Sequence, residues 1–243
     1  MTFETVHGLV IKYSDYKEND RILSVLTVER GFMTLTARGC RKKNTSMIAA
    51  CEICVYSEFV IYKRCGVYNV STATVLESFY PIREEYDKFE SAEQVLHMTR
   101  ILTYLTHSWD NAFKLCYHTL SFIAYTDNNP IDLELCFAVK FLKLAGYQPK
   151  LLNCVLCGKD LRREKELRFS KAMGGAMCNY CGTGSRIVEP LTLEAIRRML
   201  ILPINEMNKV RLPENTRKEL DTIVYEYAEF NLEQTVKIRC LKL

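Results

Sequence analysis

Two cysteine pairs separated by twenty residues constrain this chain more than any other feature of its sequence. Residues 154–181 read CVLCGKDLRREKELRFSKAMGGAMCNYC, and each pair has the spacing C-x₂-C. One such turn places two thiolates on one ion, and a second turn completes the tetrahedral shell that Zn²⁺ prefers. The predicted ligands are Cys154, Cys157, Cys178 and Cys181. Four thiolates leave no open position, so the pattern predicts one structural Zn²⁺ per chain and no chemistry at the metal.

The N-terminus favours metal over disulfides for these pairs. MTFET lacks the basic and apolar segments of a signal peptide, and no stretch approaches the roughly 20 apolar residues of a membrane span. We therefore expect a cytoplasmic protein with no membrane contact. Disulfides are rare in that compartment, so the eleven cysteines are expected to be thiols or metal ligands.

A further C-x₂-C pair, Cys51 and Cys54, is predicted to lie in a strand. Residues i and i+3 of a strand point to opposite faces, so these thiols are not expected to share an ion. We interpret the pair as barrel packing. The remaining cysteines show no metal spacing and are expected to be ordinary thiols: Cys40, Cys65, Cys116, Cys136 and Cys240.

Short segments rich in Val, Ile, Leu, Thr and aromatic residues, separated by turn signals, predict five strands before Pro81. The predicted strands are 4–13, 21–28, 32–38, 52–62 and 66–76, with a hairpin turn at 63–66. A five-stranded barrel of the OB type fits this spacing, and an SH3-like barrel is the alternative. The sequence thus predicts an OB-fold domain over residues 1–80.

After Pro81 the apolar spacing becomes helical, which predicts an α+β protein with a helical domain over residues 81–243. Ser91 and Gln94 have the spacing of a capping box. Further helices are expected around 112–123, from 133 to 145, from Thr192 to before Pro203, and from Thr216 to Glu233. The zinc-binding insertion occupies about residues 150–186.

The net charge of +4 is unevenly distributed. Lys and Arg outnumber Asp and Glu by 10 to 8 in residues 1–80 and by 18 to 12 in residues 141–243, whereas acidic residues lead by 9 to 5 between them. Basic ends favour an anionic partner such as nucleic acid, and a solvated surface is the alternative. The basic segment RGCRKKNT at 38–45 and nearby tyrosines are typical of single-strand binders, although a charged, exposed turn would look the same.

No catalytic constellation is visible in the sequence. None of the four histidines stands in a zinc-protease or deaminase motif, and the glycines form no phosphate-binding loop. Acidic pairs such as Glu84-Glu85 have the character of a solvated surface. The pattern therefore argues against an enzyme.

Three stretches resemble the bacterial RecO recombination mediators. Residues Gly8–Thr45 match the N-terminal signature of that family, with its G-x-V-[LI]-K start, D-Y-x-E-x-[DS]-R segment and A-[RK]-G-x-[RK]-[RK] loop. Gly146–Gly158 (GYQPKLLNCVLCG) and Phe169–Cys178 (FSKAMGGAMC) resemble the motifs around its zinc cysteines, and the tail from residue 226 has a similar layout. The likeness spans nearly the whole chain in the right order.

The resemblance implies a nucleoid-associated DNA repair protein with an OB fold and a zinc-bearing helical domain. It implies binding of single- and double-stranded DNA and annealing of complementary strands without a nucleotide. It also implies partnership with RecR and with the C-terminal tail of single-stranded DNA-binding protein (SSB), so that RecA can load. The DNA-binding residues carried over within the matched motifs are Lys12, Arg21, Arg38, Arg41, Lys42 and Lys43.

The chain departs from the family pattern in two places. Residues 47–51 read MIAAC where L-x-P is usual, and Lys17 stands where glycine is common. Two other functions stay open. A sequence-specific regulator could read DNA with Arg162, Arg163 and Lys165 in the zinc ribbon, and the acidic middle of the chain could serve a protein-interaction scaffold.

Overall fold

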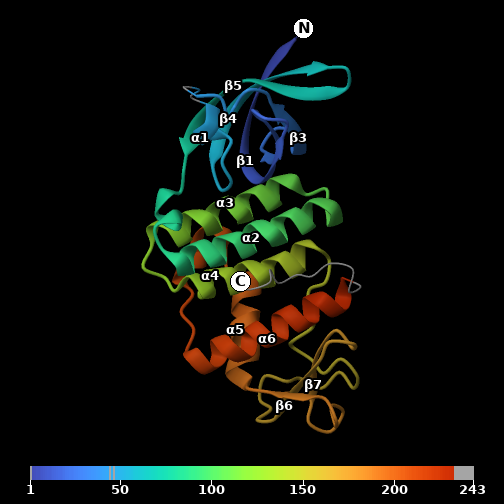
Figure 1. The fold of residues 1–243 in the computed structure, drawn as a ribbon. Helices are drawn as coiled ribbons and strands as arrows, with labels where there is room; N and C mark the ends of the chain where they lie inside the picture. Colours follow the sequence, from blue (N-terminus) through green and yellow to red (C-terminus); the bar gives the residue numbers. More distant parts are fainter. Residues whose placement is uncertain (1, 44, 46, 233–243) are drawn as a thin grey trace. The chain divides into compact units, whose positions relative to one another are not determined.

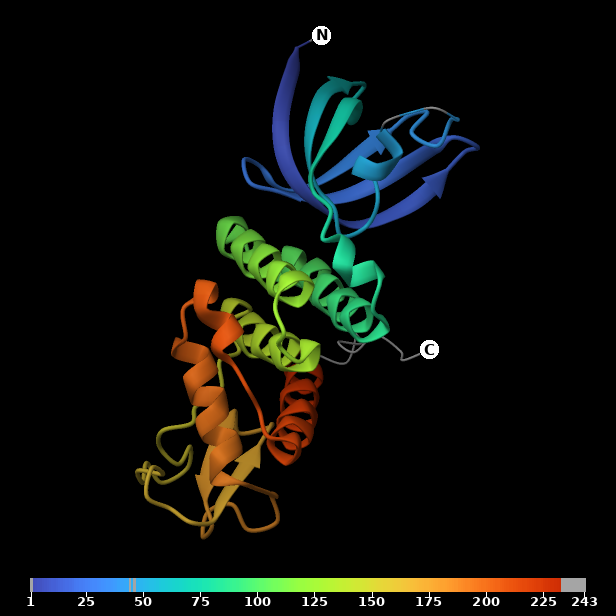
Figure 2. The ribbon, with the colours of Figure 1, turned by 90° about the vertical axis from the view of Figure 1, so that its left-hand side faces the viewer.

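The computed structural model describes residues 2–43, 45 and 47–232, and the chain packs as two compact units, residues 1–124 and 125–243. Figures 1 and 2 show a barrel and helices in the first unit, and helices with a small sheet in the second. By contacts, the helices between residues 81 and 124 group with the barrel. The domain boundary at residue 80 stays a prediction. No described helix has both the length and the apolar character needed to cross a membrane.

The barrel contains the five strands that the sequence predicts. They are β1 (Phe3–Tyr16), β2 (Asp20–Thr27), β3 (Gly31–Ala37), β4 (Tyr56–Arg64) and β5 (Val67–Glu77). Their order is β1-β2-β3-β5-β4, and antiparallel pairing of β1 with β4 closes the barrel. The parallel contact between β3 and β5 is short, joining Leu35 to Tyr68 and Thr36 to Asn69. A closed five-stranded barrel with this crossover confirms the OB type over the SH3-like alternative.

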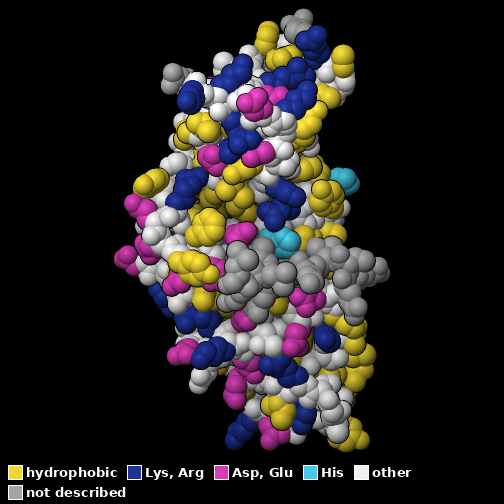
Figure 3. Space-filling model, viewed as in Figure 1, with side chains coloured by type: hydrophobic (Ala, Val, Ile, Leu, Met, Phe, Trp, Pro, Cys, Tyr) yellow, Lys and Arg dark blue, Asp and Glu magenta, His cyan; other side chains and the backbone are white. Residues whose placement is uncertain are grey.

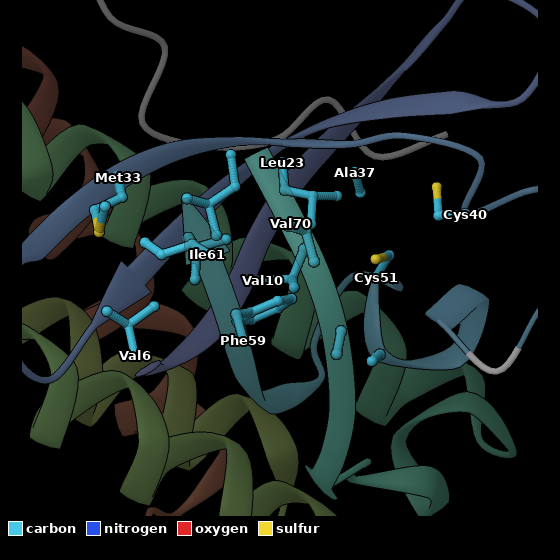
Figure 4. Packing of buried hydrophobic residues seen from close by; sticks show 14 residues of the cluster. Val6, Val10, Leu23, Met33, Ala37, Cys40, Cys51, Phe59, Ile61 and Val70 are labelled. Atoms are coloured by element: carbon cyan, nitrogen blue, oxygen red, sulfur yellow. The ribbon is translucent and has the colours of Figure 1, made fainter. Parts of the chain in front are cut away.

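Alternating apolar residues fill the barrel. Along β2, Leu23 and Val25 are fully buried, and Phe59 and Ile61 of β4 point into the same cluster. Figure 4 shows side chains from the strands converging there, with Cys40 and Cys51 at one edge of the cluster. Burying a side chain of this size stabilises the fold by about 1.5–3 kcal/mol.

The entry to β4 differs from the prediction. The sequence predicts a strand over 52–62, but Met47–Ala50 form a short helix, α1, and residues 51–54 form a turn before β4 begins at Tyr56. Cys54 has a positive φ of 63°, and its N–H donates to the carbonyl of Val10 at 2.9 Å. The prediction that Cys51 and Cys54 lie in a strand is therefore wrong, because this turn is tied to β1.

Two helices, α2 (Tyr86–Leu105) and α3 (Trp109–Tyr125), follow a 3₁₀ turn, η1 (Tyr80–Arg83). The predicted capping box at Ser91 is wrong, because α2 begins a turn earlier and Ser91 is buried within it. Arg100 of α2 donates to the carbonyl of Ile11 in β1 at 3.1 Å. Trp109 lies against Gly31, where an added Cβ would come within 2.4 Å of the indole ring. These contacts pack α2 and α3 on the barrel.

The second unit contains α4 (Pro130–Leu144), α5 (Pro190–Ile201), a 3₁₀ turn η2 (Ile204–Lys209) and α6 (Glu214–Asn231). The nearly continuous apolar character of α4 predicts burial, and ten of its residues are buried. Lys140 of α4 is buried too, and its ammonium donates to the carbonyls of Met199 and Leu202. It thereby satisfies carbonyls at the C-terminal end of α5.

Two predicted helix starts in this unit shift by two residues. α5 begins at Pro190 and α6 at Glu214, so Thr192 and Thr216 lie inside the first turns of these helices. The Thr192 hydroxyl instead bonds to the carboxylate of Glu219. The predicted end of the last helix at Glu233 lies outside the described residues.

The segment between α4 and α5, residues 150–188, is called the cysteine lobe below. It holds three short strands, β6 (Leu167–Ser170), β7 (Gly175–Cys178) and β8 (Arg186–Val188), in the order β7-β6-β8. The sequence predicts an insertion here but not its sheet, because strands of three or four residues give too short a pattern to identify. The four predicted ligands lie in the turns of this lobe and at the end of β7.

Candidate metal centre and nucleic-acid interface

The four predicted ligands come together in the cysteine lobe. Their sulfur atoms all lie within 4.8 Å of one another, and the sulfurs of Cys157 and Cys178 are 3.8 Å apart. A tetrahedron with metal–sulfur bonds of ~2.3 Å has edges of about 3.8 Å. The donor set therefore fits a thiophilic metal ion, and the described residues contain no other cluster of potential ligands of this kind.

Each cysteine pair sits on a turn that the backbone closes tightly. The Gly158 N–H donates to the carbonyl of Cys154 at 2.9 Å, and the Gly182 N–H donates to that of Cys178 at 2.9 Å. Gly158 has a φ of 76°, which glycine adopts without strain. At Gly182, an added Cβ would come within 2.8 Å of the Arg168 side chain. Both glycines are thus required by the turns that bring the sulfurs together.

The electrostatics of the cluster favour a bound cation. Burial alone would raise the pKa of the Cys154 thiol, but backbone N–H groups of Cys157, Cys178 and Leu156 lower it to about 6. Hydrogen bonds with Cys157 and Cys178 raise the pKa of Cys181. Four adjacent sulfurs cannot all ionise without compensation, because like charges at this distance repel. A divalent ion supplies that compensation.

The basic loop, residues 38–43, follows β3 and folds back on the β1–β2 turn. The Gly39 N–H donates to the Asp20 carboxylate at 2.8 Å, and the Arg41 N–H donates to the carbonyl of Asn19 at 3.1 Å. Cys40 is fully buried in the barrel cluster, so it anchors the loop from below. Backbone hydrogen bonds and the buried Cys40 side chain therefore fix the loop on the barrel. The basic side chains on either side of Cys40 are exposed to solvent.

The six predicted DNA-binding residues fall into two groups. Five are exposed: Lys12 on β1, and Arg38, Arg41, Lys42 and Lys43 on the basic loop. Among them, the Arg41 guanidinium lies 3.1 Å from the carboxylate of Asp15. β1 and β3 both flank β2 in the barrel, so Lys12 and the basic loop lie on either side of β2. Figure 3 shows Lys and Arg side chains gathered on the barrel.

Arg21 differs from the other five because it is only 7% exposed. Its guanidinium lies 3.9 Å from the centre of the Tyr13 ring, bonds to the carboxylates of Asp15 and Glu52, and donates to the carbonyl of Cys51. The structure places this arginine inside an ion-pair network that ties β2 to the turn after α1. Asp15 also pairs with the exposed Arg41, so the buried Arg21 is linked to the surface of the barrel through Asp15.

Sequence reasoning missed a second basic cluster on the barrel, at the β4–β5 hairpin. The Arg30 guanidinium donates to the Tyr68 hydroxyl at 2.9 Å, and the Lys63 ammonium lies 5.2 Å from the centre of the same ring. The sequence identifies residues 63–66 only as a turn. The β4–β5 loop and the face formed by strands 2 and 3 are where OB folds bind oligonucleotides, and this is the signal that could have found the cluster.

Comparisons with known proteins agree along the whole chain. Residues 1–79 match the family described as "Recombination protein O N terminal", and residues 86–239 match "Recombination protein O C terminal". The DNA repair protein RecO of Desulforamulus reducens is 27% identical over 98% of this chain and 93% of its own length. The RecO proteins of Acetivibrio thermocellus and Caldicellulosiruptor saccharolyticus are 24% and 25% identical, over 96% and 98% of this chain and 94% and 97% of their own lengths. This chain therefore belongs to the RecO family of recombination proteins.

Proposed function

We propose that this protein acts in bacterial DNA repair and recombination by binding DNA strands on its barrel and annealing complementary ones. The observation that carries the proposal is the set of exposed cations on an OB-type barrel in a chain of the RecO family: Lys12, Arg38, Lys42 and Lys43. Such cations neutralise phosphates and release counterions whatever the base sequence. Neighbouring tyrosines supply faces on which bases stack. This chemistry suits single- and double-stranded DNA without strong sequence preference.

In this proposal the protein works without catalysis. It helps load RecA onto SSB-coated DNA together with RecR, and it contacts the C-terminal tail of SSB. Family membership is the support for these partners and for a cytoplasmic, nucleoid-associated location. Annealing needs no covalent step, and the sequence contains no catalytic motif.

The metal in the cysteine lobe is proposed to be Zn²⁺. The support is the chemistry of four sulfurs clustered within 4.8 Å of one another, two of them 3.8 Å apart. Cys154, Cys157, Cys178 and Cys181 would hold the ion, and it would supply folding energy to the lobe instead of a reactive water.

The test is strand annealing measured with two complementary fluorescent oligonucleotides coated with SSB, without ATP. The unmodified protein is expected to accelerate annealing, and Arg38→Ala/Lys42→Ala/Lys43→Ala to abolish most of that acceleration. For single strands, the slope of log K against log salt concentration is expected to become shallower by about 2, because each lost phosphate contact contributes about 0.7.

The matched control is Arg198→Ala/Lys209→Ala/Lys218→Ala. These cations are exposed too, but each pairs with a glutamate on its own 3₁₀ or α-helix. If both triple variants lost annealing acceleration equally, the loss would be due to the lower net charge and not to the position of the cations on the barrel. No acceleration by the folded, unmodified protein would sink the proposal.

The alternative, a regulator that reads DNA with the cysteine lobe, predicts that Arg162→Ala/Arg163→Ala/Lys165→Ala abolishes DNA binding. The structure offers it little support. Arg162 forms an ion pair with Asp160, and Lys159 forms one with Glu164 at 2.8 Å, so much of the charge in this loop is neutralised locally.

A further inference from the structure

A hollow of ≈310 Å³ opens in the second unit, between the sheet of the cysteine lobe and α6. Its size falls at the lower end of small-ligand sites, about 300–1,000 Å³. Figures 1 and 2 both show the sheet lying beside α6. The lobe contributes Ser170, Lys171, Ser185 and Arg186 to its wall, and α6 contributes Glu226. Phe169, Ala172 and Ile223 complete the wall with apolar side chains.

The hollow exists because the pairing of two strands stops early. In the β6–β8 ladder, Leu167 pairs with Val188 and the last pair is Phe169 with Arg186. Beyond that pair the chains separate, with Ser170 on one side and Ser185 on the other. The open end of the ladder therefore presents two hydroxyl-bearing residues to the same space.

The lobe places two cations beside α6. Arg186 is the direct partner of Phe169, so these two side chains project from the same side of the sheet. That side faces α6, because the Phe169 ring packs against Tyr227 with centroids 5.5 Å apart. Lys171 lies in the turn after β6, and its ammonium approaches the Phe230 ring of α6. Lys171 and Arg186 thus both approach the same helix.

Neither cation is fully neutralised. The Lys171 ammonium lies 5.7 Å from the centre of the Phe230 ring, and within the described chain no carboxylate pairs with it. Arg186 lies 3.6 Å from the carboxylate of Glu226, and the two side chains are 42% and 51% exposed. An exposed pair at that distance contributes little, about 0–1 kcal/mol. Phe230, the ring that the Lys171 ammonium approaches, is 44% exposed.

We propose that this hollow binds one nucleotide of a single DNA strand. Its phosphate would lie between Lys171 and Arg186, and its base would stack on Phe230. The proposal rests on the proposed annealing function, which requires a second strand to be held while the barrel holds the first. It assigns that second contact to the cysteine lobe and α6.

The test measures binding of the full-length, metal-loaded protein to a fluorescent dT15 oligonucleotide across a range of salt concentrations. Lys171→Ala/Arg186→Ala is expected to make the slope of log K against log salt shallower by about 0.7, because the one phosphate contact held by both cations is lost. The matched control, Lys209→Ala/Arg198→Ala, removes one Lys and one Arg elsewhere in this unit and is expected to leave the slope unchanged.

Two single variants separate a binding site from general charge. Glu226→Gln removes the carboxylate that competes with phosphate for Arg186, so it is expected to tighten dT15 binding by up to about fivefold. Phe230→Leu is expected to weaken dT15 about fivefold or more, and to leave an abasic 15-mer unaffected, because only the stacking is lost. A purely structural role predicts neither the gain nor the dependence on bases.

The outcomes distinguish this inference from the function on which it rests. If the variant at Arg38, Lys42 and Lys43 loses binding and Lys171→Ala/Arg186→Ala behaves as its control, the hollow is not a strand site and the proposed function stands. Weaker binding by Glu226→Gln would also overturn the inference. Thymidine 5′-monophosphate binding that Lys171→Ala abolishes, with dT15 binding intact, would reassign the hollow to a free nucleotide. No binding of dT15 by the unmodified protein would overturn both.

Discussion

The spacing C-x₂-C occurs at Cys51–Cys54 in the barrel unit and at Cys154–Cys157 in the cysteine lobe, but the surroundings shift the pKa of the Cys51 and Cys54 thiols and that of the Cys154 thiol in opposite directions. In the barrel unit, burial raises the pKa of Cys51 and of Cys54 to about 12. In the lobe, backbone N–H groups overcome the effect of burial and lower the pKa of Cys154 to about 6. The first pair consists of neutral packing groups, whereas the second is prepared to bind a cation.

The difference lies in the surroundings of the sulfurs. Cys51 lies beside Cys40 in the barrel cluster, whereas Cys54 lies near Cys116 of α3, so the two thiols of this pair face different neighbours. In the lobe, a second pair supplies two more sulfurs within 4.8 Å. A C-x₂-C spacing therefore predicts a metal ligand pair only where another pair and free amides face it.

The largest effect that would break this contrast is expected from Cys178→Ser. It removes one thiolate from the shell, so the metal should be lost and the unfolding free energy should fall by several kcal/mol, since site formation is coupled to folding. Elemental analysis and denaturant unfolding measure the two effects. A variant that kept a full equivalent of metal and its stability would contradict the closed four-thiolate site.

Gly182→Ala is expected to have the next largest effect, because it keeps every sulfur but disturbs their turn. The added Cβ would meet the Arg168 side chain at 2.8 Å and the carbonyl of Cys178 at 3.1 Å. We expect a loss of about 1–3 kcal/mol in unfolding free energy and a weaker hold on the metal in a chelator competition. Thr183→Ala, at the exposed neighbouring residue, serves as the control and should change both quantities less.

Cys51→Ala tests the other side of the comparison. It removes a buried sulfur from the barrel cluster, so the unfolding free energy should fall by about 1 kcal/mol while the metal content stays at that of the unmodified protein. Both are measured as for Cys178→Ser. Loss of metal in this variant would mean that the two regions are not independent in the way the cysteine geometry indicates.

The smallest effect is expected on the barrel when the metal is removed. Trp109 is the single tryptophan, and it lies against Gly31 within the first unit. A strong chelator should therefore expose the lobe cysteines to alkylation and leave the tryptophan emission unchanged. The Cys51 and Cys54 thiols should stay unalkylated at pH 8, where groups with a pKa of about 12 are protonated. A shift in emission that accompanies metal loss would show that the lobe supports the barrel.

Much of the fold was predictable because its signals are local. Period-two apolar patterns locate all five barrel strands, and the near-continuous apolar run from Leu133 identifies a buried helix. Boundaries shifted where distant contacts decide them. β4 starts late because Cys54 bonds to Val10, and α2 starts at Tyr86, so Ser91 is buried inside the helix.

The site shows the same division. The cysteine spacing by itself determined the metal cluster, because two turns and a linker bring four sulfurs together with little help from the rest of the chain. The sequence by itself also identified the basic loop, since RGCRKK carries four cations within six residues. Only the tertiary structure decided which arginines face solvent: Arg21 is withdrawn between Asp15 and Glu52, thirty-seven positions apart in the chain, while Arg38 beyond the next strand stays exposed. The Tyr68 cluster and the hollow beside α6 likewise depend on side chains from separate elements, and a pattern in one segment cannot encode what another segment places beside it.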